Sequence, residues 1–387
     1  MDSELPLEVR MLRDIVRRFV DEELIPIEMS VPPDGEDMPP DIIKPLQEKA
    51  KKLGLWNLRV PQELGGMGLG LLEAAVVNAE VSRSKAISPR FNELFGPMVD
   101  PVLLTSCNPE QKERFLMPAL RGDIRVCFAQ TEPDAGSDPA SMRTRAIRNG
   151  NHYVLSGSKR FISFGGLSDF AEVLCVTDPA KGGRGGISCL VVDLKSPGVS
   201  IPRRWPTMMD DSPWEIHFDD VKVPVENRLG EEGQGFALGQ HYLTAGRVSG
   251  QGAWSLGAAE RSIEIAMDYA KVRKTFGEAL AERQAVQFMV ADSEMDLRTA
   301  RLLVYHTAKK FDRGEDIRNE SYMVKIYCVE MASRVIDRAL QILGGIGLSK
   351  DLPVEYFYRQ VRSRRITEGP TEVLRWRLGR NLLRARN

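Results

Sequence analysis

The sequence has few of the residues that build covalent or metal-held frameworks: five cysteines and four histidines among 387 residues. The cysteines are odd in number and form no Cys-x-x-Cys pair, which indicates reduced thiols and argues against a disulfide framework. The histidines lie far apart, with no two at metal-ligand spacing, so we expect no metal site. The cysteines are Cys107, Cys127, Cys175, Cys189 and Cys328, and the histidines are His152, His217, His241 and His306.

The sequence also lacks an excess of charge of one sign and a long apolar run. Lys and Arg total 53 and Asp and Glu total 54, which gives a formal net charge of -1. General nucleic-acid binding usually needs a basic excess that displaces counterions from phosphate. No apolar stretch is long enough to span a bilayer, and residues 1–18 lack the apolar core of a signal peptide. We therefore expect a cytoplasmic protein without a membrane span or a nucleic-acid partner.

Common motifs for nucleotides and nucleophiles are missing too. There is no GxxxxGK phosphate loop, no GxGxxG after a strand and no GxSxG elbow. These absences disfavour nucleotide kinases, NAD-dependent dehydrogenases of the usual type, and serine or zinc hydrolases.

The periodicity of apolar residues changes twice along the chain and predicts three regions. Residues 1–125 have helical spacing, residues 126–232 read as short strands separated by turn residues, and residues 233–387 are helical again. Helices are expected over residues 8–24, 39–53, 71–83 and 109–120. In the third region two apolar stripes have bundle spacing. The stripes are Val286, Val290, Ser293, Leu297, Ala300 and Val304, and Cys328, Met331, Val335, Ala339 and Ile342.

The segment Cys127–Asp138 opens the strand region with two hydroxyls and a Pro-Asp-Ala-Gly turn. Such a loop can present backbone N–H groups and hydroxyls to a polar heterocycle or a phosphate. A tight turn between a helix and a strand is the alternative, and spacing alone favours it.

This segment resembles the TEPxAGSD signature of the acyl-CoA dehydrogenase family, and four later segments resemble further elements of that family. They occur in the family's order and span nearly the whole chain. The four are Lys159-Arg-Phe-Ile-Ser163 for K-x-W-I-T, Arg273-Lys-Thr-Phe-Gly277 for RxxFG, Gln341-Ile-Leu-Gly-Gly345 for QxxGG, and Thr367-Glu-Gly-Pro-Thr371 for Y-E-G-T. The resemblance implies an N-terminal α-helical domain, a middle β-barrel or sandwich domain and a C-terminal four-helix-bundle domain.

The resemblance implies that Glu368 is the catalytic base. A carboxylate in an apolar, water-poor pocket gains basicity and can take a proton from the α carbon of a thioester. Pro370 suits the first turn of the last helix, and backbone N–H groups at this turn can stabilise the developing enolate oxygen. In the alternative interpretation Glu368 only caps a helix.

The resemblance also implies an FAD site built from three parts of the chain. The flavin face is formed by Phe128, Gln130, Thr131, Gly136, Ser137, Phe161 and Ser163. The adenine and pyrophosphate are bound by Arg273, Thr275, Phe276, Gln341, Gly344 and Gly345, with Pro370 near the cofactor. In the family this second set comes from a neighbouring subunit, which implies a homodimer or homotetramer. Core packing is the alternative for Phe161, and a surface position is the alternative for Arg273.

The resemblance implies substrate contacts for Ser137, Arg247, Thr367, Gly369 and Arg380. The phosphates of CoA require cations near the entrance of the site, which Arg247 and Arg380 would supply. Arg247 and Arg380 could instead be solvated helix charges. The sequence departs from the family where Phe161 replaces Trp, Thr367 replaces Tyr and Pro370 replaces Thr. Gln130 and Thr244 stand where many members have an aliphatic residue and an Asp, respectively. The form Glu368-Gly-Pro-Thr-Glu372 resembles a branch with an E-G-P-x-E motif, and these departures leave the acyl group of the substrate open.

Three hypotheses follow from these residues. In the first, the protein dehydrogenates an acyl-CoA between its α and β carbons, and an electron-transfer flavoprotein takes the electrons. In the second, the same fold and FAD serve a flavin oxidase or monooxygenase on a substrate without CoA. In the third, the arginine-rich C-terminal region binds DNA without catalysis, against which the near-neutral net charge weighs.

Overall fold

The computed structural model describes residues 5–31, 39–87, 93–97, 99, 101–183 and 185–384. The chain forms two compact units. Unit 1 contains Met1–Pro33, Pro61–Pro89 and Thr244–Asn387, and unit 2 contains Asp34–Val60 and Arg90–Leu243. The N-terminal region that the sequence marks as helical is thus divided between the two units.

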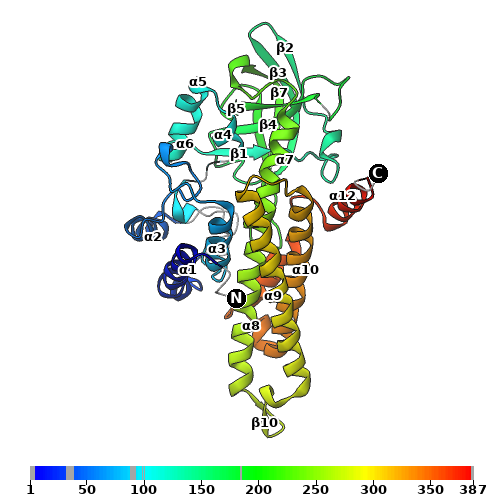
Figure 1. The fold of residues 1–387 in the computed structure, drawn as a ribbon. Helices are drawn as coiled ribbons and strands as arrows, with labels where there is room; N and C mark the ends of the chain where they lie inside the picture. The colour runs from blue at the N-terminus through cyan, green and yellow to red at the C-terminus, as the bar shows by residue number, and fades with distance from the viewer. Residues whose placement is uncertain are drawn as a thin grey trace. The chain divides into compact units, whose positions relative to one another are not determined.

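Unit 2 is built on one eight-stranded β-sheet (Figure 1). Its strands pair in the order β6-β7-β3-β2-β4-β5-β8, and β1 lies parallel to β4. The strands are β1 (Val126–Ala129), β2 (Arg145–Asn149), β3 (His152–Ile162), β4 (Phe170–Val176), β5 (Ile187–Asp193), β6 (Val199–Arg204), β7 (Trp214–Pro224) and β8 (Arg228–Leu229). β4 and β5 are nearly continuous apolar runs that are buried on both faces, as expected of central strands.

Short helices complete unit 2: α2 (Pro40–Lys52), α4 (Pro101–Ser106), α5 (Pro109–Gln111) and α6 (Met117–Arg121). The helix α7 (Gly235–Gly246) carries the chain from unit 2 into unit 1. Its first residue, Gly235, lies so close to the backbone of Ser188 and Cys189 that a Cβ there would be 2.3 Å from the carbonyl carbon of Ser188. Only glycine allows α7 to begin this close to β5.

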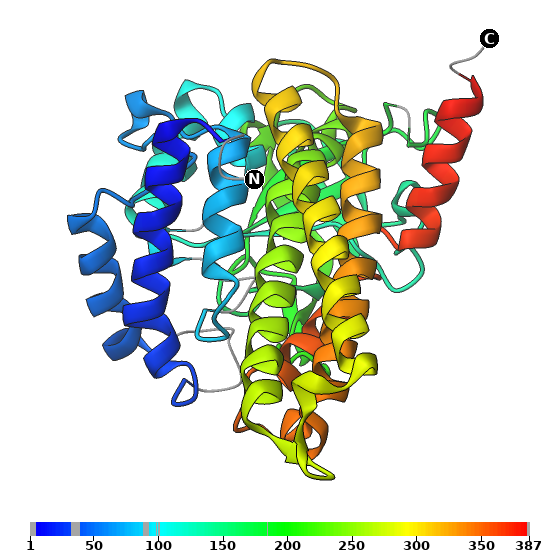
Figure 2. The ribbon, with the colours of Figure 1, turned by 60° about the horizontal axis from the view of Figure 1, so that its bottom comes forward.

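Unit 1 is helical. Its helices are α1 (Leu7–Phe19), α3 (Leu71–Val81), the π-helical segment η9 (Arg247–Gly252), α8 (Ala253–Val272), α9 (Gln284–Asp312), α10 (Arg318–Leu343), α11 (Val354–Arg364) and α12 (Thr371–Arg384). Figures 1 and 2 both show α8, α9 and α10 side by side along most of their length. None of the helices in the described ranges has the combination of length and apolar character that crossing a membrane requires.

The order of a helical, a sheet-rich and a second helical part along the chain is confirmed, and so are the two apolar stripes predicted from the sequence. The stripe on α10 is fully buried, and the stripe on α9 is buried from Ser293 onward, with Val286 and Val290 packed at its edge. α10 ends at Leu343, and Gly344 follows with a φ of +63°, which terminates the helix as the sequence indicates.

Two of the predicted helices change their hydrogen-bonding pattern before a proline. The helix expected over 8–24 becomes π-helical at Val20–Leu24, two residues before Pro26. The helix expected over 109–120 becomes π-helical at Lys112–Leu116, two residues before Pro118. Proline lacks an N–H donor and its ring crowds the preceding turn, so a wider turn relieves the clash. No proline follows the π-helical segment η9 closely, so its wider turn has another cause.

We predict that Gly257→Ala destabilises unit 1 by about 1–3 kcal/mol through overpacking. Gly257 on α8 faces α3, and a Cβ at this position would lie 1.9 Å from the carbonyl oxygen of Ala79. The matched control is Gly379→Ala on α12, where the added Cβ would meet no atom of another described element within 4 Å. We expect the control to be neutral or stabilising by up to about 1 kcal/mol, because alanine is the better helix former. Urea unfolding of both variants would measure this, and equal midpoints would contradict the close approach of α3 and α8.

Candidate functional site

Glu368 lies in the turn between α11 and α12 with a left-handed backbone. Its φ is +56°, and the next residue, Gly369, has a φ of +98°. A non-glycine residue with positive φ costs free energy and persists only where the surroundings enforce it. The structure shows what enforces it here.

Two buried cations from two other elements hold consecutive carbonyls of this turn. The Arg247 guanidinium at the start of η9 donates to the carbonyl oxygen of Glu368 from Nε at 3.1 Å and Nη2 at 3.0 Å. The Lys325 ammonium on α10 donates to the carbonyl oxygen of Gly369 at 2.7 Å. Arg247 is only 4% exposed and Lys325 is fully buried. The desolvated charges need these carbonyls as partners, and the turn is fixed as a result.

Burial lowers the pKa of both cations. For Arg247 the nearby Glu368 carboxylate offsets part of this effect. For Lys325 burial lowers the pKa to about 8, although the Glu368 carboxylate again acts in the opposite direction. Arg247 is therefore not a solvated helix charge, and it donates to the backbone carbonyl of the predicted base.

The two oxygens of the Glu368 carboxylate have different surroundings. Oε1 accepts a hydrogen bond of 2.6 Å from Nε2 of Gln251, which lies one turn after Arg247 in η9. Oε2 is buried and, within the described ranges of the chain, has no hydrogen-bond partner. A side chain that capped α12 would accept from the first turn of that helix, and neither oxygen does so. The geometry therefore favours the interpretation of Glu368 as a base over that of a cap.

In unit 2 the residues predicted for the flavin face lie on two adjacent segments. The Arg160 N–H donates to the carbonyl oxygen of Thr131 at 2.8 Å, which joins the two segments. The buried Lys159 ammonium donates to the carbonyl of Gln130 at 3.0 Å and to the Glu132 carboxylate at 2.8 Å. Although burial alone would raise the pKa of Glu132, the Lys159 ammonium and the Arg143 N–H lower it. The contact between Lys159 and Glu132 fixes the loop to β3.

Phe161 is exposed, which rules out the alternative of core packing. Its side chain is 52% exposed at the end of β3, and its backbone has a φ of +59°. The ring of Trp205 meets it edge to face, with the ring centroids 5.3 Å apart. An exposed aromatic ring on a strained backbone next to a fixed polar loop is available for stacking on a planar ligand.

The remaining residues of the predicted flavin face are accessible or incompletely bonded. Gln130 has a buried Oε1 atom without a partner among the described residues. Glu132 and Ala135 form a tight bridge, so the predicted turn exists, and it leaves Gly136 and Ser137 exposed. Phe128 packs against Tyr242 of α7 with the ring centroids 5.7 Å apart, and Ser163 is half-buried.

The residues predicted for the adenine end of FAD lie at the surface of unit 1. Arg273, Thr275 and Phe276 belong to a small hairpin made by β9 (Lys274–Thr275) and β10 (Glu278–Ala279). Phe276 occupies its tip with a φ of +51° and is 99% exposed. Gln341, Gly344 and Gly345 are exposed at the end of α10. None of these side chains contributes to the core of its own chain.

Of the residues predicted to bind substrate in unit 1, Arg247 and Gly369 adjoin Glu368. Thr367 precedes Glu368 in the same turn and is half-buried. Pro370 directly precedes α12, one position before the first-turn place that the sequence predicts. Arg380 is exposed on α12, where its guanidinium lies 5.5 Å from the ring of Trp376.

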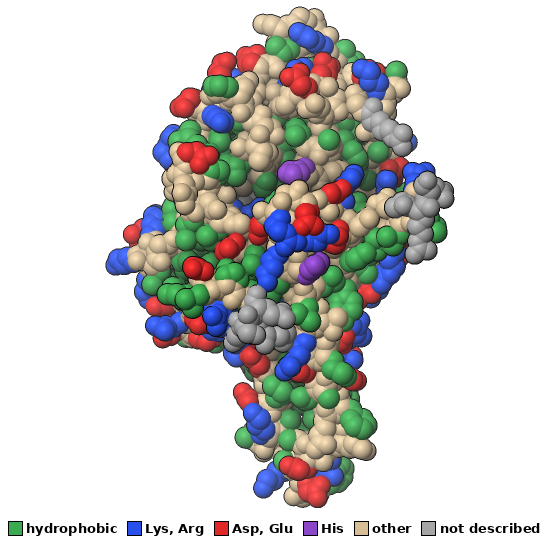
Figure 3. Space-filling model, in the orientation of Figure 1, with side chains coloured by type: hydrophobic (Ala, Val, Ile, Leu, Met, Phe, Trp, Pro, Cys, Tyr) green, Lys and Arg blue, Asp and Glu red, His purple; other side chains and the backbone are tan. Residues whose placement is uncertain are grey.

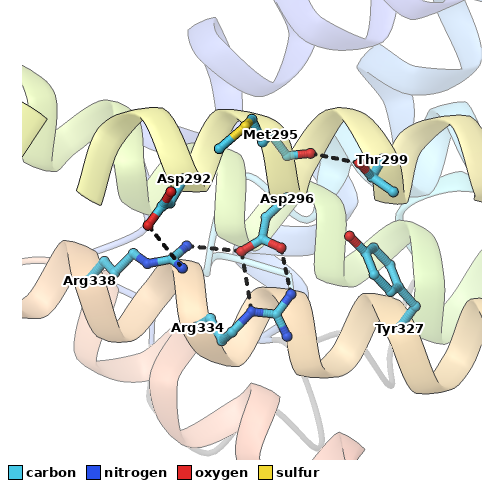
Figure 4. Close-up of a pocket in the computed structure, with 7 residues that line it drawn as sticks. All are labelled: Asp292, Met295, Asp296, Thr299, Tyr327, Arg334 and Arg338. Atoms are coloured by element: carbon cyan, nitrogen blue, oxygen red, sulfur yellow. Dashed lines mark hydrogen bonds and ion pairs between the residues drawn. The ribbon is translucent and has the colours of Figure 1, made fainter. Parts of the chain in front are cut away.

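A pocket of about 330 Å³ on the surface of α9 and α10 contains none of the predicted residues (Figure 4). Its charges neutralise one another, because Arg338 and Arg334 both pair with Asp296. The C-terminal arginines are likewise partly paired, for example Arg375 with Glu330. On the face in Figure 3, basic and acidic side chains are interspersed. Neither surface resembles a nucleic-acid site.

Comparison with known protein families matches most of the chain. The models of the N-terminal, middle and C-terminal domains of acyl-CoA dehydrogenase match residues 6–123, 127–221 and 233–383. The chain belongs to the acyl-CoA dehydrogenase family. As a member, it is a flavoprotein oxidoreductase whose cofactor is FAD.

Individual relatives cover nearly all of the chain. The caffeyl-CoA reductase-Etf complex subunit CarC of Acetobacterium woodii is 36% identical over 94% of this chain and 95% of its own length. The structure of butyryl-CoA dehydrogenase from Megasphaera elsdenii has a TM-score of 0.87 at 30% identity, covering 98% of each chain. A structure of PigA with FAD and proline has a TM-score of 0.88 at 25% identity, covering 99% of each chain.

The residues of this acyl-CoA dehydrogenase fit the flavin of FAD on grounds of their own. An isoalloxazine ring offers a flat aromatic face, one N–H donor and several acceptors. The exposed ring of Phe161 can stack on that face, and the unpartnered Oε1 of Gln130 requires a donor. The exposed loop at Gly136 and Ser137 supplies N–H and hydroxyl donors.

Sequence reasoning missed Gln251, Lys325 and Arg364, which surround Glu368 in the structure. One signal was available: Gln251 follows Arg247 by four residues among small residues, and this spacing places two polar groups on one helix face. Lys325 and Arg364 gave no signal, because a charged residue on a helix is usually solvated.

We predict that the free energy of unfolding rises with pH between 8 and 10.5 because of Lys325. Its pKa is about 8 in the folded protein and 10.5 when exposed. Between these values the unfolded chain binds more protons, so raising the pH favours the folded state. Relative to Lys325→Met, wild-type stability should rise by about 3 kcal/mol at most across this range.

Urea unfolding at several pH values would measure the difference between the two proteins. Lys222→Met is the control. Lys222 is exposed on β7, so this variant shows the effect of removing a lysine that is not buried. A difference between wild type and Lys325→Met that does not change with pH would contradict a buried, desolvated ammonium at this site.

Proposed function

We propose that the protein catalyses FAD-dependent α,β-dehydrogenation of an acyl-CoA thioester, with Glu368 as the base. The observation that carries this proposal is the buried Oε2 of Glu368, which has no hydrogen-bond partner among the described residues and lies in a turn whose two carbonyls are held by buried cations. A carboxylate oxygen without a donor is a strong acceptor for a proton. A left-handed residue that other elements enforce is typical of functional sites.

The residues divide the work as follows. Glu368 takes the proton from the α carbon, and backbone N–H groups of its turn stabilise the charge that develops on the thioester oxygen. FAD, when bound, supplies the acceptor for the hydride that leaves the β carbon. Arg247 donates to the backbone carbonyl of Glu368, so the charge of Arg247 serves to position the base. Thr367, Gly369 and Ser137 are proposed to contact the substrate, and the exposed Arg380 suits a phosphate of CoA.

The FAD site is proposed to combine two copies of the chain. Phe128, Gln130, Thr131, Phe161 and Ser163 hold the flavin, with the loop at 136–137. The hairpin of Arg273, Thr275 and Phe276, the exposed end of α10 (Gln341, Gly344 and Gly345) and Pro370 serve the remainder of the cofactor. A phenylalanine that is 99% exposed is costly in water, and a cofactor in a partner subunit would cover it.

A row of apolar side chains on α9 supports a homo-oligomer. Phe288, Met295 and Leu302 are spaced by seven residues, lie on one helix face and are each about half exposed or more. Such a stripe is typical of a helix that packs against another helix. We propose that a second copy of the chain covers it.

An electron-transfer flavoprotein is the proposed electron acceptor. The relative CarC is named as a subunit of a complex with Etf. Its name also contains caffeyl-CoA, which makes aryl-substituted acyl groups a class to test beside straight and branched chains.

A second candidate is a flavin oxidase or monooxygenase that acts on a substrate without CoA. The observation in its favour is the PigA structure, which contains FAD and proline and resembles the whole chain. Glu368, with its buried Oε2, favours the dehydrogenase. Rapid reoxidation of the reduced protein by oxygen would favour the oxidase.

We predict that one class of acyl-CoA bleaches the flavin absorbance of the protein when oxygen is excluded. The panel contains straight-chain, branched and aryl-substituted thioesters, and free amino acids test the second candidate. Glu368→Gln should slow this reduction by about 10²- to 10⁴-fold while FAD stays bound. Glu355→Gln, at a carboxylate paired with Arg359 on α11, is the control and should react normally.

Two outcomes would overturn the proposal. A protein whose flavin no acyl-CoA reduces is not an acyl-CoA dehydrogenase. If Glu368→Gln is reduced as fast as wild type, the dehydrogenase activity stands but the base is another group.

We further predict that Phe288→Asp or Met295→Asp weakens the oligomer and, with it, FAD retention. A carboxylate buried in an apolar interface costs several kcal/mol of association free energy. Ile147→Asp is the matched control, because Ile147 on β2 is 60% exposed, as is Phe288. Analytical ultracentrifugation should show dissociation for the α9 variants only. Unchanged mass for both would exclude this face as the interface.

A further inference from the structure

We infer that Gln251 and Arg364 position the Glu368 carboxylate so that Oε2 is the oxygen that takes the substrate proton. The inference rests on the proposed role of Glu368 as the base and goes beyond it by assigning two positioning residues. Neither belongs to any motif in the sequence, and both are buried among the helices of unit 1.

The first step concerns the carboxylate. Nε2 of Gln251 donates to Oε1 of Glu368 at 2.6 Å. A carboxylate that is held at one oxygen and by its own backbone cannot rotate freely. The second oxygen, Oε2, is buried without a partner in the described part of the chain. The two oxygens are thereby distinguished: one is occupied and the other is available.

The second step concerns the direction of the Gln251 amide. Nη1 of Arg364 donates to Oε1 of Gln251 at 3.0 Å. A guanidinium has only donors, so the amide must turn its oxygen toward Arg364 and its NH₂ group toward Glu368. The Arg364 guanidinium lies over the ring of Trp254, 3.8 Å from its centroid, and is 7% exposed. It is therefore held in place and dictates the orientation of the amide.

The third step concerns access to Oε2. Gly246, the last residue of α7, lies beside it: a Cβ at this position would be 3.8 Å from Oε2. Any side chain here would occupy the space next to the acceptor oxygen. Glycine leaves that side open, while Gln251 occupies the other oxygen.

The fourth step concerns charge. The groups that face Glu368 are Arg247 from η9, Lys325 from α10 and Arg364 from α11. Tyr322 of α10 lies near Arg247, and Glu372 of α12 lies near Lys325. Arg247 and Lys325 donate to backbone carbonyls, and Arg364 reaches the carboxylate only through the amide. Among the described residues no cation forms a direct ion pair with the carboxylate, and the neutral amide of Gln251 holds it in place.

The test is the pH dependence of flavin reduction under anaerobic conditions, with the acyl-CoA that reduces the wild-type holoenzyme. Gln251→Met removes the donor at similar volume. It should slow reduction about 10- to 100-fold, the worth of one hydrogen bond to a charged group, with little change in the substrate concentration for half-saturation. The apparent pKa of the rate profile should rise, because the ionised carboxylate loses a donor.

Gln251→Glu is the second variant. It places a second carboxylate beside Glu368, and like charges at this distance cannot both ionise. The profile should move to higher pH by about one unit or more. This variant keeps shape and polarity, so it tests the inference even if Gln251→Met folds poorly.

Arg364 is tested by coupling. If it acts through Gln251, the double variant Gln251→Met/Arg364→Met should be no slower than Gln251→Met alone. Arg364→Lys keeps a donor for the amide and should recover part of the rate that Arg364→Met loses. Gln111→Met is the matched control, because Gln111 in unit 2 is a buried glutamine whose side chain makes three hydrogen bonds. Its loss should lower stability and leave the rate profile unchanged.

The outcomes separate the two proposals. If wild type is reduced but both Gln251 variants keep its rate and pH profile, the positioning role is wrong and the proposed function stands. If no acyl-CoA reduces wild type, the proposed function fails and the positioning role fails with it. Additive losses from Gln251→Met and Arg364→Met would show that Arg364 acts independently of the amide.

Discussion

The site in unit 1 depends on buried cations that need backbone carbonyls as partners. Arg247 and Lys325 are removed from water, and the carbonyls of Glu368 and Gly369 are what they bond to. These hydrogen bonds offset the free-energy cost of removing the two charges from water. They also hold the turn in a left-handed conformation that it would not adopt alone. Because the two cations come from η9 and α10, the turn is ordered only when the helices of unit 1 have packed.

Unit 2 contains the same kind of interaction between a buried cation and a backbone carbonyl. Lys159 is fully buried and donates to the carbonyl of Gln130, next to the residues proposed to face the flavin. Lys325 is fully buried and donates to the carbonyl that follows Glu368. In each unit a desolvated ammonium orients the backbone beside a functional side chain, without occupying the side chain itself. These ammonium groups thus fix the main chain beside the proposed site residues without bonding the side chains of Gln130 and Glu368.

The sequence predicted much of this protein, and the failures have one physical cause. Apolar periodicity predicted the helices and strands, since each buried face needs regular spacing. Family motifs pointed to Glu368 and Phe161, but not to their strained backbones. The family resemblance pointed to Arg247 as a substrate contact, but not to its hydrogen bonds with the Glu368 carbonyl. The roles of Gln251 and Arg364 were not predicted. Periodicity identifies which face of a helix is buried, but it does not identify which polar group on another helix will contact that face.

A base that takes a proton from the α carbon of a thioester faces two opposed requirements. It must be fixed, because misplacement by an ångström slows proton transfer greatly, and it must stay basic, because a direct ion pair would favour its ionised form and weaken it. An arginine in direct contact would meet only the first requirement, and an unbonded carboxylate only the second. An amide between guanidinium and carboxylate meets both, since it transmits the orientation of Arg364 while its neutral NH₂ group bonds a single oxygen. The widened turn of η9, which no proline explains, carries both Arg247 and Gln251, and a π-helical turn at such a point is typical of functional sites.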